Sequence, residues 1–334
     1  MTKTASLLAT LAAVIGRTLG RIAGSPDAPL DPAERMRRRR ARDHARLLRG
    51  ELDCALTNGE IYLVYQPKLC LRTGAYDGVE ALIRWQHPNL GEVDRGSVIT
   101  IAEESGQINA LTLWVLGQAI ADQDHLLKQG IDLSFHVNMS GKSLGNDAFI
   151  AEVCALIRTA SGVIGFEITE TAFIDNPQAA LVNFHLLAAA GISLSIDDYG
   201  SGHSSLAYLK ELPADELKID KLFVSGMTSS NRDPLIVRST IDLAHALGMR
   251  VVAEGVESHA TLALLRVMGC DVAQGFFISP ALRPAALETL LRDAAHLARL
   301  TNTDTSLTPA KAFWVRSERD HAPGAVADGA AAKE

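Results

Sequence analysis

The feature that most constrains the fold of this chain is a regular alternation of two kinds of segment. Short runs rich in β-branched and apolar residues predict strands, and longer stretches of helical period separate most of them. Eight strands are expected, at 61–70, 79–85, 133–138, 163–169, 192–196, 216–219, 251–253 and 272–278. The helical stretches are 110–129, 147–160, 177–190, 234–247, 261–268 and 283–297. This alternation indicates the α/β class, and eight units favour a closed (β/α)8 TIM-like barrel over an open sheet.

The first two predicted strands depart from this scheme. A short segment around Thr73-Gly74 joins them, and it is too short for a helical crossover. We therefore expect an antiparallel hairpin here, so that the barrel has an antiparallel first strand.

The two ends of the chain differ in composition from its centre. Residues 1–46 contain an apolar segment, a Pro-rich linker at 24–32 and an Arg-rich run, and residues 1–50 carry a net charge of +7 against −14 for the rest. The apolar segment is too short to span a bilayer, so a frayed or dimer-packing helix, contact with a membrane surface and a signal peptide stay open. The Arg-rich run has no interleaved aromatics, which favours a solvated face or contact with anionic lipid over nucleic-acid binding. We expect a barrel over 47–299 and a disordered tail over 300–334.

Four cysteines lie far apart in the sequence, at 54, 70, 154 and 270, and form no C-x-x-C pair. This spacing disfavours a disulfide scaffold and a zinc ribbon, and it suits a reducing cytoplasm. A cytoplasmic protein is therefore expected, with the N-terminus at the inner membrane as an alternative.

Acidic and amide side chains recur at or just beyond the ends of the predicted strands. They include Glu80, Asn138, Glu167, Glu170, Asp197, Asp198, Asp220, Glu254, Glu257 and Gln274, with Lys218 among them. The carboxyl ends of barrel strands converge on one mouth, where so many carboxylates would repel one another strongly. Oxygen ligands of this kind favour Mg²⁺ or Mn²⁺ over zinc. Capping or turn formation explains any one of these residues, but not their recurrence at strand after strand.

Several ordered blocks of sequence resemble a known family. They are Tyr65-Gln-Pro-Lys68, Glu80-Ala-Leu-Ile-Arg84, Ile101-Ala-Glu-Glu-Ser-Gly106, Val137-Asn-Met-Ser140, Glu167-Ile-Thr-Glu170, Asp197-Asp-Tyr-Gly-Ser-Gly202, Leu217-Lys-Ile-Asp220, Val252-Ala-Glu-Gly-Val-Glu257 and Gln274-Gly-Phe276. Their order and spacing are similar to those of EAL domains, the bacterial cyclic di-GMP phosphodiesterases, over residues 50–298. The resemblance implies a metal-dependent enzyme that converts cyclic di-GMP to linear pGpG.

The resemblance also implies a role for each matching residue. Glu80, Asn138, Glu167 and Asp197 resemble ligands of one metal ion, and Asp198 resembles a ligand of a second, with Asp197 bridging. Lys218 and Glu254 are similar to residues that orient the attacking water. Gln66, Leu82, Arg84 and Gln274 resemble substrate contacts. Glu170 resembles the glutamate that holds the loop after Asp198, and this loop implies a homodimer.

Small departures from the family pattern accompany this match. Tyr199, Ser201 and His203 replace the more usual Phe, Thr and Tyr, and the block from Gln274 to Pro280 is one residue short. The shorter block concerns the rim of the substrate site rather than the metal positions. A catalytically silent cyclic di-GMP receptor and a protein-interaction module are the alternatives, and the complete set of metal positions favours the enzyme.

Overall fold

The computed structural model describes residues 48–169, 177–200 and 209–301. The chain divides into two units, Met1–Cys54 and Ala55–Glu334, and the second contains every strand of the described ranges. The predicted boundaries at 46/47 and 299/300 stay predictions. None of the described helices is both long enough and apolar enough to cross a bilayer.

Eight strands close into a barrel, which confirms the predicted fold class. The strands follow one another round the sheet, and pairing between the first two completes the circle. They are β1 (Ile61–Cys70), β2 (Tyr76–His87), β4 (Ser134–Met139), β5 (Ile164–Thr169), β6 (Ser193–Tyr199), β7 (Glu216–Ile219), β8 (Arg250–Ala253) and β9 (Val272–Gln274). A ninth strand, β3 (Gly91–Val93), extends β2 as a hairpin and was not predicted.

The predicted antiparallel first strand is confirmed. β1 runs antiparallel to both of its neighbours, β2 and β9, while the other pairings between the eight barrel strands are parallel. Gly74, with φ of 69°, closes the turn between β1 and β2, and its N–H donates to the carbonyl of Cys70 over 2.9 Å. Glycine takes this left-handed conformation without steric cost, which is why so short a connection suffices.

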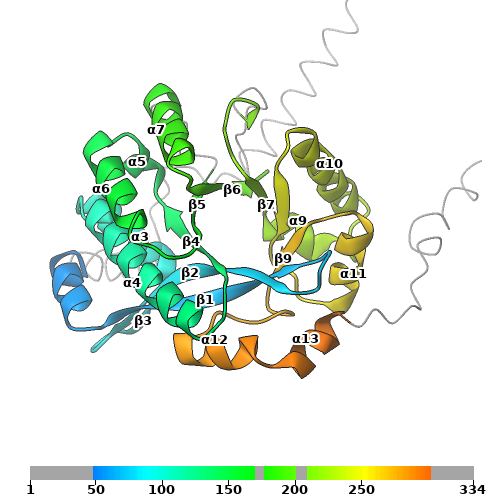
Figure 1. The fold of residues 1–334 in the computed structure, drawn as a ribbon, viewed down its shortest axis with the longest axis horizontal. Coiled ribbons are helices and arrows are strands. Elements are labelled where there is room, and N and C mark those ends of the chain that lie inside the picture. The colour runs from blue at the N-terminus through cyan, green and yellow to red at the C-terminus, as the bar shows by residue number, and fades with distance from the viewer. Residues whose placement is uncertain (1–47, 170–176, 201–208, 302–334) are drawn as a thin grey trace, which may run out of the picture. The chain divides into compact units, whose positions relative to one another are not determined.

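Helices lie around the outside of the strands (Figure 1). They are α3 (Arg95–Glu104), α4 (Ile108–Lys128), α5 (Gly141–Leu144), α6 (Asp147–Ile157), α7 (Pro177–Ala189), α9 (Lys221–Gly226), α10 (Asp233–Ala246), α11 (His259–Val267), α12 (Pro284–Leu291) and α13 (Ala294–Thr301). The last two replace the single helix predicted at 283–297. The carboxylate of Asp293 accepts from the N–H of His296, so it caps a new helix where the sequence pattern continued the old one.

Adjacent residues on a barrel strand point to opposite sides of the sheet. Phe135, Phe166 and Leu217 are fully buried apolar residues, and each precedes a buried polar residue, namely His136, Glu167 and Lys218. Tyr65, on β1, donates its hydroxyl hydrogen to Asp122 of α4 over 2.6 Å, so its side chain faces the helices. The apolar positions therefore pack under the helical layer, and the alternate polar positions fill the interior of the barrel.

Candidate active site

The carboxyl ends of the parallel strands bring the predicted site residues to one mouth of the barrel, as expected for this fold. Glu80 comes from β2, Asn138 from β4, Glu167 from β5 and Lys218 from β7. Asp197 and Asp198 are on β6, Glu254 follows β8 directly, and Gln274 ends β9. Because β1 is antiparallel, Gln66 reaches the same region from the middle of its strand, opposite Glu80.

The carboxylate of Glu80 is held by amide groups on both sides. Asn138 donates from Nδ2 to Oε1 over 2.8 Å, and Gln274 donates from Nε2 to Oε2 over 2.6 Å. Nη1 of Arg95 lies 3.5 Å from Oε1, and the Glu80 side chain is 7% exposed. These donors fix the orientation of the carboxylate at the mouth of the barrel.

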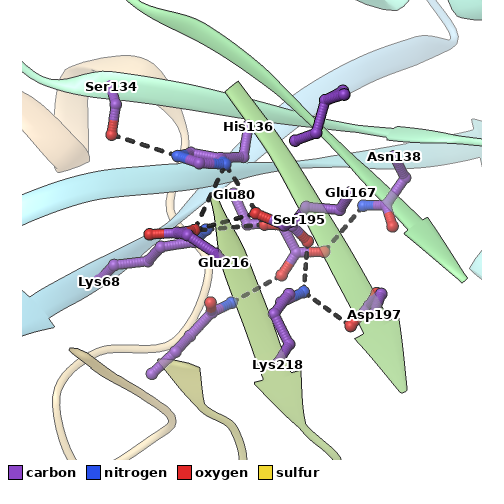
Figure 2. A network of polar contacts seen from close by, with 12 residues as sticks. Lys68, Glu80, Ser134, His136, Asn138, Glu167, Ser195, Asp197, Glu216 and Lys218 are labelled. Atoms are coloured by element: carbon purple, nitrogen blue, oxygen red, sulfur yellow. Dashed lines mark hydrogen bonds and ion pairs between the residues drawn. The ribbon is translucent and has the colours of Figure 1, made fainter. Parts of the chain in front are cut away.

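Lys218 is the centre of the acidic group, as Figure 2 shows for its contacts with Glu167 and Asp197. Its Nζ contacts Oε2 of Glu167, lies 3.0 Å from Oδ1 of Asp197 and lies 2.6 Å from Oε1 of Glu254. Burial alone would lower the pKa of Lys218, but the three surrounding carboxylates raise it well above its usual value. The lysine therefore stays charged and offsets part of their repulsion.

The carboxylates around Lys218 differ in protonation. Burial would raise the pKa of Glu167, but the ammonium groups of Lys218 and Lys68 hold it far below its usual range. Burial raises the pKa of Glu254 to about 8, since the nearby Asp197 and Glu80 outweigh part of the attraction of Lys218. The pKa of Glu254 is thus shifted toward neutral pH, whereas that of its neighbour Glu167 is shifted in the opposite direction.

Asp198 has a strained backbone, with φ of 55°. Its N–H donates to Oδ1 of the preceding Asp197 over 2.9 Å, a short local bond that aspartate can provide. Burial, together with the charges of Asp197 and Asp220, raises the pKa of the Asp198 carboxyl. The turn therefore presents two adjacent carboxylates that repel each other in the absence of a cation.

The oxygen donors fit divalent metal ions. The ligand atoms of Glu80, Glu167 and Glu254 lie within 4.8 Å of one another, and so do those of Asp197, Asp198 and Glu254. These two groups share Glu254, which the resemblance places beside the attacking water. Carboxylate oxygens are the donors that Mg²⁺ and Mn²⁺ prefer, so either group could hold an ion of this class.

The predicted substrate contacts lie in two places. Gln66 accepts from Nε2 of Gln274 over 3.2 Å, close to Glu80. Leu82 is buried and lines a cavity of about 550 Å³ together with Asn138 and residues of α3 and α4. Arg84 lies farther along β2, roughly 13 Å from Glu80 at the usual rise of a strand, and its Nε is 3.6 Å from Glu92 of β3. The structure thus brings Gln66 and Leu82 to the site and places Arg84 at its edge.

One predicted site residue, Glu170, and the loop at 201–208 lie outside the described residues. Sequence reasoning also left four charged or titratable side chains without a role, namely Lys68, Arg95, His136 and Glu216. Three of them, Lys68, His136 and Glu216, are buried and share a strand face with predicted site residues two positions away. A charged residue at an inward position of an otherwise apolar strand was the signal that could have found them.

Comparison with known proteins identifies the family. A family model of the EAL domain matches residues 49–281. The chain belongs to the EAL domain family. This EAL domain contains every strand of the barrel and every described residue of the candidate site.

Two curated relatives are named as cyclic di-GMP phosphodiesterases. "Cyclic di-GMP phosphodiesterase NbdA" of Pseudomonas aeruginosa is 40% identical over 246 residues, which cover 72% of this chain and 31% of that protein. "Cyclic di-GMP phosphodiesterase PA2567" of the same organism is 36% identical over 241 residues, which cover 71% and 41%. The chain therefore spans less than half the length of these relatives.

Solved EAL structures have the same fold. A structure described as "PaMucR Phosphodiesterase, c-di-GMP complex" is 35% identical, with a TM-score of 0.68, and the match covers 72% of this chain and 99% of that one. The EAL enzyme Bd1971 in its cGMP-bound form is 31% identical, with a TM-score of 0.70 and coverage of 77% and 73%.

Proposed function

We propose that this chain is a metal-dependent phosphodiesterase that hydrolyses cyclic di-GMP to linear pGpG. The observation that carries the proposal is the meeting of Glu80, Asn138, Glu167, Asp197, Asp198, Lys218 and Glu254 at one mouth of the barrel. The names of its relatives, which include cyclic di-GMP phosphodiesterases, indicate the substrate.

The proposed reaction is a displacement at phosphorus. The oxygen of a water molecule forms a new P–O bond and the bond from phosphorus to one ribose 3′ oxygen breaks. That oxygen leaves as a hydroxyl, and the proton it gains balances the one that the attacking water gives up. Two bound Mg²⁺ or Mn²⁺ ions would acidify the water and neutralise charge on the phosphate. Glu80, Asn138, Glu167, Asp197 and Asp198 would hold them.

The chain's own residues would supply the proton transfer and the orientation. Glu254, whose carboxyl pKa is raised to about 8 by burial, is suited to take the proton of the attacking water near neutral pH. Lys218, 2.6 Å from Oε1 of Glu254, would donate a hydrogen bond to the same water and fix its direction of attack. Gln66, Leu82, Arg84 and Gln274 would bind the dinucleotide, and Glu170 would hold the loop after Asp198.

The test is hydrolysis of cyclic di-GMP by the purified chain, with pGpG separated from substrate by chromatography. We expect turnover with Mg²⁺ or Mn²⁺ and none with EDTA. Glu80→Gln should lower the rate at least about 100-fold, because a metal loses an anionic ligand. Glu288→Gln, in α12 where the carboxylate pairs with Arg292, is the matched control and should keep the wild-type rate. Binding of cyclic di-GMP without hydrolysis would identify a silent receptor, and neither binding nor hydrolysis would identify an interaction module.

We also propose a cytoplasmic homodimer that forms through the segment after Asp198. Gly200 begins this segment, and a Cβ there would lie 2.9 Å from the ring of Phe223 on α9, so the two are packed together. Leu222, next to Phe223 in α9, is 66% exposed, so this part of α9 offers apolar surface to a partner. Light scattering should report a dimer for the wild type and a weaker one for Leu222→Asp. Contact of residues 1–46 with a membrane surface stays a separate prediction, to be tested by vesicle sedimentation.

A further inference from the structure

A column of charged side chains with alternating sign runs from the solvent-exposed Arg250, at the amino ends of the strands, into the interior of the barrel beneath the candidate site. From the amino ends of the strands upward it consists of Asp77, Arg250, Glu216, Lys68, Glu167 and Lys218. Figure 2 shows its central members, with Lys68 and Glu216 on the side of Glu167 away from Asp197. The proposed chemistry uses only the upper end of this column, so the lower members need another explanation.

Lys68 is the cation below Glu167. Its side chain is fully buried, and its Nζ lies 2.8 Å from Oε1 of Glu167. The other oxygen of the same carboxylate, Oε2, contacts Lys218 on the side of the mouth. The two lysines thus hold the two oxygens of one carboxylate from opposite sides, which determines the orientation of its plane.

Glu216 holds Lys68 in turn. Oε2 of Glu216 lies 3.7 Å from the Nζ of Lys68 and accepts from the hydroxyl of Ser195 over 2.9 Å. Oε1 of Glu216 lies 3.4 Å from Nη1 of Arg250, and Arg250 donates to Asp77 over 2.8 Å. His136 fills the remaining side, with Nδ1 3.9 Å from Oε2 of Glu216. Lys68 is therefore anchored from below by residues whose own positions are determined.

Burying these charges is costly, and an apolar barrel interior of the same volume is often at least as stable. A core role alone therefore gives no reason for a lysine at this position. A positioning role does, because the partners that orient a ligand commonly affect metal affinity or activity by about 10- to 100-fold.

We propose that Lys68, held by Glu216, is a positioning residue that fixes the carboxylate of Glu167 for binding a divalent metal ion at the mouth. This proposal takes the bound metal ion from the proposed function. It adds a role for Lys68 and Glu216, two residues that do not face the substrate. Lys68 holds Oε1 of Glu167. Oε2 of the same carboxylate therefore stays directed at the mouth, where a metal ion would bind beside Lys218.

The experiment measures Mn²⁺ binding to the full chain by calorimetry without substrate, alongside melting curves. Lys68→Met keeps the length of the side chain and removes the charge, and we expect it to weaken Mn²⁺ binding about 10- to 100-fold. Glu216→Gln, which keeps both shape and Lys68, should weaken binding by a smaller factor and covers the case in which Lys68→Met does not fold. The double variant should show less than the product of the two effects, because both act through one contact.

The matched control is Gln123→Met, which removes a buried hydrogen bond to the carbonyl of Leu133 and a partly buried one to the carbonyl of Val163, at the opposite end of the strands. It should lower the melting temperature and leave Mn²⁺ binding unchanged. Mn²⁺ binding by folded Lys68→Met or Glu216→Gln that is equal to or tighter than the wild type would overturn the proposal, and so would a wild type that binds no Mn²⁺. If Mn²⁺ binding depends on Lys68 as expected but the wild type leaves cyclic di-GMP intact, only the proposed function is removed.

Discussion

Asp198 combines two demands in one residue, a left-handed backbone and a carboxylate beside another carboxylate. The backbone conformation costs an ordinary residue about 1 kcal/mol or more, and Asn tolerates it nearly as well as Asp. Burial, followed by the charges of Asp197 and Asp220, raises the pKa of its carboxyl. The metal-free fold therefore disfavours the ionised form of this side chain. The carboxylate of Asp198 thus lowers the stability of the metal-free fold, although the proposed function requires it.

Replacing Asp198 by Asn should therefore raise the melting temperature of the metal-free protein, because the repulsion is relieved while the backbone is unchanged. The same variant should lose about 100-fold in hydrolysis, the usual scale for a misplaced or missing group at a reacting centre. Asp198→Ala is the comparison, and the strained backbone should lower its melting temperature below that of Asp198→Asn. Equal melting temperatures for the two variants would contradict this account of the backbone.

The buried His136 should make the stability of the fold depend on pH in the acid range. Burial, followed by the charge of Lys68, lowers the pKa of His136 to about 4, from 6.5 when the chain is unfolded. Between about pH 6.5 and pH 4, His136 is therefore protonated in the unfolded chain and neutral in the folded chain. Stability is lost as the pH falls, by about 2 kcal/mol between pH 7 and pH 5.

The effect of His136 has to be measured as a difference between two proteins. Glu254, with its pKa raised by burial to about 8, acts in the opposite direction over the same range, because its folded form binds the proton first. The test is urea unfolding of the metal-free wild type and of His136→Gln at pH 7 and pH 5. Between these two pH values, the free energy of unfolding of the wild type should fall by about 2 kcal/mol relative to that of the variant. An identical pH dependence in both would mean that His136 accepts a proton in the fold. The exposed His185→Gln serves as control.

At the scale of elements, the end of β9 determines where Gln274 meets Glu80. Gly275 follows directly, and a Cβ there would lie 2.2 Å from both the N and the O of Val256. The N–H of Val256 donates to the carbonyl of Gln274 over 3.0 Å, so this close approach is what ties β9 to the segment after β8. A larger residue must push the two backbones apart.

We expect Gly275→Ala to destabilise the fold by about 1–3 kcal/mol, the usual cost of overpacking, and to lower hydrolysis because Gln274 moves. Gly117→Ala is the matched control, since it lies inside α4 with open space at the Cβ position. It should raise stability by about 1 kcal/mol, because alanine favours a helix interior. Equal melting temperatures for Gly275→Ala and the wild type would show that the β9 junction can relax.

At the scale of the whole molecule, the barrel gathers carboxylates from β2, β5, β6 and the end of β8 at one mouth, and the ion pairs of Lys218 offset part of their charge. A ligand that binds only the folded chain stabilises it by about 2.7 kcal/mol at 100 times its dissociation constant. Divalent metal ions should therefore raise the melting temperature.

Mg²⁺, Mn²⁺ and Ca²⁺ should each raise the melting temperature, whereas only Mg²⁺ and Mn²⁺ should support hydrolysis. Ca²⁺ takes longer and looser coordination and would misplace the attacking water. Scanning calorimetry and the hydrolysis assay at equal metal concentrations check both expectations. The gain in melting temperature should fall in Asp197→Asn, and a gain unchanged in that variant would place the ions elsewhere.

Much of the fold follows from local sequence. The strand and helix periods, the short turn at Gly74 and the count of eight units predict a barrel with an antiparallel first strand, because each signal is set by residues close together in the chain. The prediction of a single helix at 283–297 was wrong, and the reason is also local. Asp293 caps a second helix within a stretch whose apolar pattern is unbroken. The recurrence of carboxylates at strand ends likewise predicts the residues of the mouth, because the carboxyl ends of barrel strands converge there.

Tertiary structure alone decided how these residues contact one another. Lys68 and Glu167 are 99 positions apart, and nothing near either residue in the sequence says that their side chains meet at 2.8 Å inside the barrel. The same holds for Glu216 and His136, which look like ordinary strand residues until the closed sheet turns them inward. Glu254 was expected beside the water, and closure of the barrel showed that it joins both carboxylate groups. Sequence periodicity reports which side of a strand a residue faces, whereas its partners across the barrel depend on strand order and register, which only the closed sheet determines.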